Sequence, residues 1–143
     1  MSAYLDTSVL VALFFREPGS VRAQQRIARE VEPLLSRWTL AEFASAAAFK
    51  VRIGHTIETT AREAARRLTR LVDDRALTLI EIERDDFAAC ARLCAAHASG
   101  LRTPDALHCA IAARWRVPLL TFDAGQARGC AHHGIDHELL LVG

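Results

Sequence analysis

Short apolar runs alternate with longer amphipathic segments along the chain, and this pattern predicts strands that alternate with helices. The short runs are mostly apolar, and we expect strands at 3–6, 33–36, 77–82, 117–121 and 138–142. In the longer segments, apolar residues recur every three or four positions. There we expect helices at 8–15, 20–30, 39–52, 57–75, 85–98 and 103–115, with a short helix beginning at Asp123.

The alternation of strands and helices determines the expected fold class. Strands that are joined by helices pair in parallel, so we expect an α/β fold with a central parallel sheet of about five strands and helices on both faces. The 143 residues correspond to a single domain, 1–143, without an internal repeat or a long linker. Ser20 is expected to cap the second helix, and Gly54 to end the third.

The composition is that of an ordinary globular domain, with 51% hydrophobic and 24% charged residues. The formal net charge of +1 excludes a broad positive field, so contact with nucleic acid would depend on local patches. No cationic apolar leader opens the sequence, and no apolar run approaches the roughly 20 residues that cross a bilayer. We therefore expect a cytoplasmic protein.

Four acidic residues occupy similar positions relative to the expected elements. Asp6 and Asp123 each follow an apolar strand, whereas Glu42 and Asp105 lie near the start of a helix. Parallel strands end at one common edge, where ligands bind in open α/β sheets, so we expect the four carboxylates to share one crevice. Crowded carboxylates raise one another's pKa, and a divalent cation relieves the repulsion. Oxygen ligands suit Mg²⁺ or Mn²⁺, which can activate a water and neutralise a phosphodiester transition state.

Three of these acids also have a purely structural interpretation. The spacing of Thr39 and Glu42 is that of a helix capping box, and Asp123 has the same spacing to Gln126. Asp105 lies in a first helical turn, where negative charge offsets the helix dipole. Asp6 is harder to explain in this way, because it ends a buried strand.

Other potential ligands are less convincing. A group near the end of the chain consists of Cys130, His132, His133 and His137. Their spacing matches no zinc pattern, and we expect a solvated loop there. Cys90 and Cys94, one helical turn apart, are expected to be small buried side chains.

Several arginines occupy the polar side of the expected helix 57–75. Arg62 follows Glu58 by four residues and Arg67 follows Glu63 by four, which predicts exposed ion pairs. A contact of this face with RNA or a protein partner stays open.

Four short motifs, in this order, resemble those of PIN-domain ribonucleases, specifically the VapC-type toxins of bacterial toxin–antitoxin pairs. They are Tyr4-Leu5-Asp6-Thr7-Ser8, Thr39-Leu40-Ala41-Glu42, Arg102-Thr103-Pro104-Asp105-Ala106-Leu107-His108 and Leu120-Thr121-Phe122-Asp123. The resemblance covers essentially the whole chain. It implies a PIN-like three-layer sandwich and a Mg²⁺- or Mn²⁺-dependent endoribonuclease.

The resemblance also implies roles for individual residues. Asp6 and Asp105 would ligate the metal, and Glu42 and Asp123 would complete the catalytic acids. Supporting hydrogen bonds would come from Ser8 and Thr121. From their positions alone, Arg102 and His108, which lie on either side of Asp105 in the sequence, are candidate contacts to RNA; for His108 the usual alternative is a structural residue with satisfied hydrogen bonds.

The family further implies a homodimer that pairs with a small VapB-like antitoxin. Two consecutive helices in 39–75 have alanine-rich faces that allow close packing. We expect the antitoxin to place a basic residue, most simply arginine, against the acidic site.

Two alternatives belong to other classes. An aspartyl-type phosphatase of the haloacid dehalogenase kind has a similar opening, but it needs a second aspartate where this chain has Ser8, and no lysine fits its later motif. A non-catalytic PIN-like binding module would use the domain only to dock a partner, and the intact set of four acids argues against it.

Overall fold

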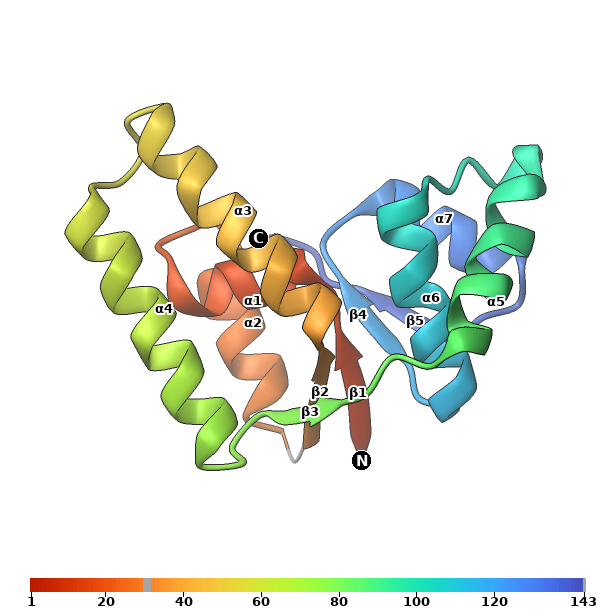
Figure 1. Cartoon of the computed structure of the whole chain (residues 1–143), viewed down its shortest axis with the longest axis horizontal. Coiled ribbons are helices and arrows are strands. Elements are labelled where there is room, and N and C mark those ends of the chain that lie inside the picture. The colour runs from red at the N-terminus through yellow and green to blue at the C-terminus, as the bar shows by residue number, and fades with distance from the viewer. Residues whose placement is uncertain (30–31, 143) are drawn as a thin grey trace.

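The computed structural model of the chain describes residues 1–29 and 32–142, and it contains one parallel sheet (Figure 1). The strands are β1 (Ser2–Leu5), β2 (Glu32–Ser36), β3 (Thr78–Ile80), β4 (Leu119–Thr121) and β5 (His137–Leu139). Their order across the sheet is β3-β2-β1-β4-β5, and all neighbouring pairs are parallel. The expected parallel sheet of five strands is confirmed.

Helices cover both faces of the sheet. They are α1 (Thr7–Phe14), α2 (Ser20–Ile27), α3 (Arg37–Arg52), α4 (Glu58–Asp73), α5 (Arg84–Ala95), α6 (Thr103–Trp115) and α7 (Ala124–His132), with a 3-10 turn at His97–Ser99. In Figure 1, α1 to α4 lie on one side of the sheet and α5 to α7 on the other. The expected three-layer α/β fold is therefore confirmed. Residue 30, the last residue of the expected helix 20–30, lies outside the described residues.

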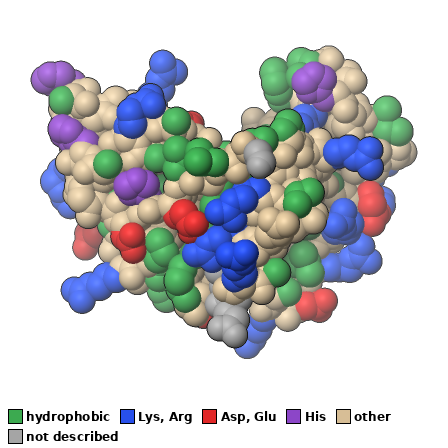
Figure 2. All heavy atoms as spheres, turned by 180° about the vertical axis from the view of Figure 1, so that it is seen from behind, with side chains coloured by type: hydrophobic (Ala, Val, Ile, Leu, Met, Phe, Trp, Pro, Cys, Tyr) green, Lys and Arg blue, Asp and Glu red, His purple; other side chains and the backbone are tan. Residues whose placement is uncertain are grey.

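The two helical layers bury two separate hydrophobic clusters, and β1 contributes to both. Ala3 and Leu5 pack with α1 to α4, whereas Tyr4 packs with α5 to α7. This alternation follows from the two-residue period of a strand, and it explains why β1 is apolar on both faces. The layers diverge where the strands end, and Figure 2 shows the hollow between them from behind.

The start of α3 differs from the expected one. The helix begins at Arg37, and Ser36 is its N-cap, with Ser36 Oγ accepting from Thr39 N at 3.4 Å. Thr39 Oγ1 accepts from Ser36 N in return, at 3.2 Å. The capping box expected between Thr39 and Glu42 is therefore wrong. Glu42 lies in the second turn and contributes nothing to the cap.

Other local expectations have mixed outcomes. Gly54 follows α3 with a φ of +78°, a conformation that glycine adopts without strain, as expected. Ser20 does not cap α2, because its hydroxyl accepts from Glu17 N and donates to Phe15 O, both at 2.9 Å, closing the turn after α1. The expected last strand ends early, and Leu141 beyond it is 69% exposed.

The cysteine- and histidine-containing segment near the end is not the expected solvated loop. Cys130 and His132 belong to α7, and Cys130 is fully buried with its Sγ 3.2 Å from that of Cys109. Cys90 is buried as expected, whereas Cys94 is partly exposed. The periodicity of Ala127 and Cys130 on one side of α7 explains why this short segment is helical and not open.

The ion pairs of α4 are only partly as expected. Arg62 pairs with Glu58 at 2.6 Å, but Glu63 pairs with Arg66 at 3.2 Å and not with Arg67. Arg67 instead places its guanidinium 5.4 Å from the centre of an aromatic ring of α1. Across 1–29 and 32–142, no helix is both long and apolar enough to cross a membrane.

Candidate acidic active site

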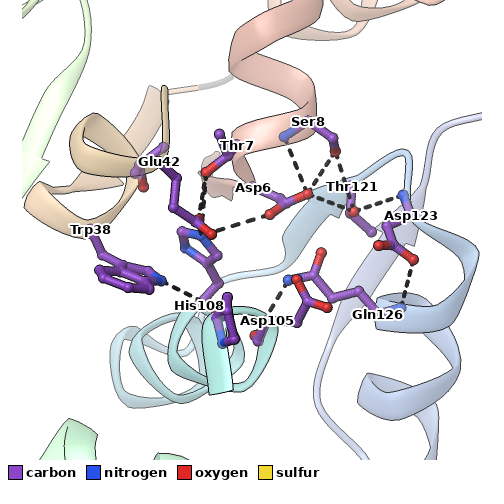
Figure 3. A network of polar contacts seen from close by, with 12 residues as sticks. Asp6, Thr7, Ser8, Trp38, Glu42, Asp105, His108, Thr121, Asp123 and Gln126 are labelled. Atoms are coloured by element: carbon purple, nitrogen blue, oxygen red, sulfur yellow. Dashed lines mark hydrogen bonds and ion pairs between the residues drawn. The ribbon is translucent and has the colours of Figure 1, made fainter. Parts of the chain in front are cut away.

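Four carboxylates lie together at the edge where β1 and β4 end (Figure 3). Asp6 and Asp123 are the N-caps of α1 and α7, directly after those strands. Asp105 lies in the first turn of α6, and Glu42 projects from α3. The expectation that these residues share one crevice follows from the parallel sheet, because helices that follow parallel strands begin at the same edge.

Asp6 is the most rigidly held of the four. Its side chain is nearly buried, and Oδ2 accepts from Ser8 Oγ at 2.6 Å, Thr121 Oγ1 at 3.0 Å and Ser8 N at 3.3 Å. The structure thus places Ser8 and Thr121 as supporting neighbours of Asp6, as expected from the sequence. Oδ1 takes none of these bonds and lies 3.8 Å from Nε2 of His108. One oxygen fixes the carboxylate, and the other faces the neighbouring side chains.

Asp123 combines a cap with a place in the crevice. Its Oδ1 accepts from Gln126 N at 3.1 Å, so the capping interpretation is confirmed. Its own N–H donates to Thr121 Oγ1 at 2.9 Å, which links it to the hydroxyl that holds Asp6. Because a carboxylate has two oxygens, capping by one leaves the other for a ligand.

The carboxylate of Glu42 contacts side chains of two other helices and caps no helix. Its Oε1 accepts from Thr7 Oγ1 at 2.8 Å and contacts His108 Nε2. These partners come from α1 and α6, so Glu42 ties three helices together at the crevice. Because Glu42 does not cap a helix, the placement of its carboxylate among these partners needs another explanation. A catalytic or metal-binding site provides that explanation.

His108 lies behind the crevice and not on its surface. Its side chain is fully buried, with Nδ1 2.7 Å from Tyr4 Oη and Nε2 against Glu42. His108 is therefore a structural residue with satisfied ring nitrogens, and the alternative of a contact with RNA is excluded, because both ring nitrogens face protein. The sequence places His108 three residues after Asp105, but it does not show that the α6 face carrying it is turned inward.

No role for Tyr4 at this site was expected from the sequence. Its hydroxyl lies 2.7 Å from Ser36 Oγ and 3.1 Å from Thr39 Oγ1, and burial raises its pKa far above the ordinary value. It therefore stays protonated and can donate to His108 Nδ1, which leaves Nε2–H to donate to Glu42. A tyrosine within a buried strand needs a polar partner, and that rule could have identified it.

The crevice is electrostatically crowded around Asp105. Burial, followed by the carboxylates of Asp6 and Asp123, raises the pKa of Asp105 to about 6, with a smaller contribution from Glu42 and an opposing one from His108. Perturbed carboxyl groups of this kind are typical of catalytic or metal-binding sites.

The donor set fits a hard divalent cation. All the acidic ligands offer oxygen, which suits Mg²⁺ or Mn²⁺. Among the described side chains, no three carboxylate, imidazole or thiol groups form a cage that could hold a metal ion. Mg²⁺ needs no such cage, because it usually keeps several waters and takes only one or two carboxylates. Nearby, the buried Oε1 of Gln126 has no hydrogen-bond partner within the described part of the chain, which leaves an acceptor for such a water.

Comparisons with known proteins agree with the fold. The family model of the PIN domain matches residues 3–131. The fold is similar to that of VapBC2 from Rickettsia felis, bound to a promoter DNA fragment, with 16% identity, a TM-score of 0.70, and coverage of 99% of this chain and 100% of that one. FitAcB from Neisseria gonorrhoeae is also similar, with 17% identity, a TM-score of 0.72, and coverage of 94% of this chain and 95% of that one. A third similar structure is VapC20 from Mycobacterium tuberculosis, a toxin that cleaves the sarcin-ricin loop. It has 16% identity, a TM-score of 0.67, and coverage of 93% of this chain and 95% of that one. The search of curated proteins finds no match.

Proposed function

Because the chain belongs to the PIN domain family, we propose that it is a Mg²⁺- or Mn²⁺-dependent endoribonuclease that hydrolyses RNA phosphodiester bonds. The observation that carries the proposal is the meeting of Asp6, Glu42, Asp105 and Asp123 at one sheet edge, although they are far apart in the sequence. The structural similarity to a ribonuclease toxin, VapC20, supports the same reaction class.

In this proposal, Asp6 and Asp105 hold the cation, and Glu42 and Asp123 complete the acidic site. A bound cation supplies a more acidic water and neutralises charge on the phosphate. Ser8 and Thr121 keep Asp6 in one orientation through Oδ2.

Glu42 is held on the other side of the crevice. Thr7 and His108 orient its Oε1, so its second oxygen can face a water or the substrate. Restricting a carboxylate in this way supports catalysis because the group needs no reorganisation when the phosphate binds.

The mouth of the crevice offers contacts for single-stranded RNA. Trp38 lies four residues before Glu42, about 6 Å along α3, and its Nε1 donates to Pro104 O at 3.2 Å. Its ring is partly exposed, and unpaired bases stack on such rings. Arg102, exposed at the start of α6, can contact a phosphate beside Asp105.

We also propose that the protein is the toxin of a VapBC-type pair, a homodimer that binds a small antitoxin. Similar structures include toxin–antitoxin complexes from Rickettsia felis and Haemophilus influenzae. The surface supports a protein partner, since a groove of about 360 Å³ lies between α3 and α4. Phe49, Ile53 and Ile57 are exposed at the tip of the same helical pair, where apolar side chains favour association.

The direct test is incubation of RNA with wild-type protein and the Asp6→Asn variant, in Mg²⁺, in Mn²⁺ and in excess EDTA. We expect cleavage of single-stranded or loop RNA only by the wild type with metal, since an amide is a poorer ligand for these cations. Full activity in EDTA would contradict the proposal. Release of phosphate from a phosphatase substrate would favour the aspartyl-phosphatase alternative, and antitoxin binding without any hydrolysis would favour a binding module.

A further inference from the structure

Gln126 is a buried polar residue between two of the catalytic acids. Its side chain is 1% exposed, and its backbone N–H donates to Asp123 Oδ1 at 3.1 Å. Its side-chain Nε2 donates to the backbone oxygen of Asp105 at 3.3 Å. One residue of α7 thus contacts both Asp123 and Asp105.

The other end of the same amide has no partner. Gln126 Oε1 is buried without a hydrogen bond to any described residue. Figure 3 shows the amide turned toward the space between Asp6, Asp105 and Asp123. Buried amide oxygens are almost always paired in native proteins, so an unpaired one indicates a donor that enters from outside the chain.

The orientation of the amide is fixed by chemistry. The backbone oxygen of Asp105 can only accept a hydrogen bond, so it requires Nε2 and repels Oε1. Exchanging the two ends would therefore lose the bond to Asp105. Oε1 is held on the side of the carboxylates, and ionised carboxylates also only accept.

We propose that Gln126 Oε1 accepts a hydrogen bond from a water molecule that the divalent cation carries into the acidic site. Waters on such a cation are strong donors, and Mg²⁺ and Mn²⁺ keep several of them. This inference rests on the proposed metal-dependent function. It makes Gln126 a positioning residue, which holds the hydrated cation without ligating it and keeps the Asp105 and Asp123 segments together.

The test compares Mn²⁺ binding by the wild type, Gln126→Met and Gln126→Glu. Methionine has a similar length but no acceptor oxygen, so we expect a dissociation constant for Mn²⁺ that is about 10- to 100-fold weaker, as for other outer-sphere partners. Glutamate keeps an acceptor oxygen but loses the donor to the Asp105 oxygen, so Gln126→Glu should bind Mn²⁺ clearly more tightly than Gln126→Met. The measurement is calorimetric titration with Mn²⁺, with thermal melts of each metal-free variant.

A matched control makes the same substitution elsewhere. Gln25 is an exposed glutamine of α2, and Gln25→Met should leave Mn²⁺ affinity unchanged. Wild-type affinity in Gln126→Met, or an equal loss in Gln126→Met and Gln126→Glu, would overturn the inference. If Gln126→Met does not fold, the glutamate variant decides alone: Mn²⁺ affinity within about 10-fold of the wild type supports the inference, and a loss of about 100-fold would overturn it.

The two proposals can fail separately. A wild type that binds Mn²⁺ with the expected order of variants, yet cleaves no RNA, would contradict the nuclease function and leave the role of Gln126 intact. A wild type that cleaves RNA with metal, alongside a Gln126→Met variant of unchanged Mn²⁺ affinity, would contradict only the role of Gln126. A wild type that binds no Mn²⁺ would contradict both.

Discussion

Replacing Asp105 with asparagine should stabilise the metal-free protein, because the change removes a charge that its neighbours disfavour. The pKa of Asp105 is about 6, against an ordinary value of 3.8. A difference of that size corresponds nominally to ~3 kcal/mol of destabilisation at neutral pH. The side chain is only half-buried, and solvent screening reduces the effect to about 1 kcal/mol.

A second effect acts in the opposite direction. Asp105 lies in the first turn of α6, where a negative charge gains ~0.3–1 kcal/mol from the helix dipole. The net gain for Asp105→Asn is therefore on the order of 0.5 kcal/mol, which corresponds to about 1–2 °C in a domain of this size. Asp85 is the matched control, since it is an exposed acid in the first turn of α5. Asp85→Asn should melt slightly lower than the wild type.

The assay is a thermal melt in EDTA, repeated as a function of pH. At low pH, a carboxyl group with a raised pKa is protonated in both the folded and the unfolded protein. As the pH rises from about 4 through about 6, it ionises first in the unfolded protein, so the folded protein loses stability. The advantage of Asp105→Asn should therefore disappear at pH 4 and be complete by pH 7.5. If Asp105→Asn and Asp85→Asn both melt lower at pH 7.5, Asp105 serves only its helix end, and the crowded-site reasoning is refuted.

Three further variants test separate parts of the account. Glu42→Gln should keep the melting temperature, since Ser36 caps α3, yet slow single-turnover RNA cleavage by about 100-fold or more; unchanged cleavage would exclude Glu42 from the reaction. Tyr4→Phe should lower the free energy of unfolding in urea by about 1–3 kcal/mol, because buried partners of its hydroxyl lose a bond; an unaltered unfolding midpoint would mean that the buried bonds contribute nothing. Trp38→Leu should weaken binding of single-stranded RNA roughly 10-fold, the loss of one stacked base, with Mn²⁺ affinity unchanged; equal RNA affinity would remove the stacking role.

The sequence predicted the fold well because the governing signals are local. Apolar runs interrupted by amphipathic segments define a parallel sheet, and a parallel sheet gathers the ends of its strands. The positions of Asp6 and Asp123 follow from that rule alone. Their neighbours Ser8 and Thr121 come from the family motifs, and the structure places both against Asp6 Oδ2.

The errors arose where tertiary contacts choose between equal local alternatives. Ser36 and Thr39 are both good caps, and the bonds of both to Tyr4 accompany the earlier start of α3. The sequence leaves a structural role and a contact with RNA open for His108, and only the burial of α6 on several sides, which turns its ring inward, decides between them. The unpaired oxygen of Gln126 could not be read from sequence, because it depends on which way one amide faces.

The most direct test of the central claim is to locate the cation. We would soak crystals of the metal-free protein in Mn²⁺ and measure anomalous scattering, for the wild type and for Asp6→Asn. The account predicts a peak between the side chains of Asp6 and Asp105 in the wild type, and a weaker or absent peak in the variant. A peak elsewhere, or none near these acids at saturating Mn²⁺, would contradict the claim that this edge of the sheet is a metal-dependent active site.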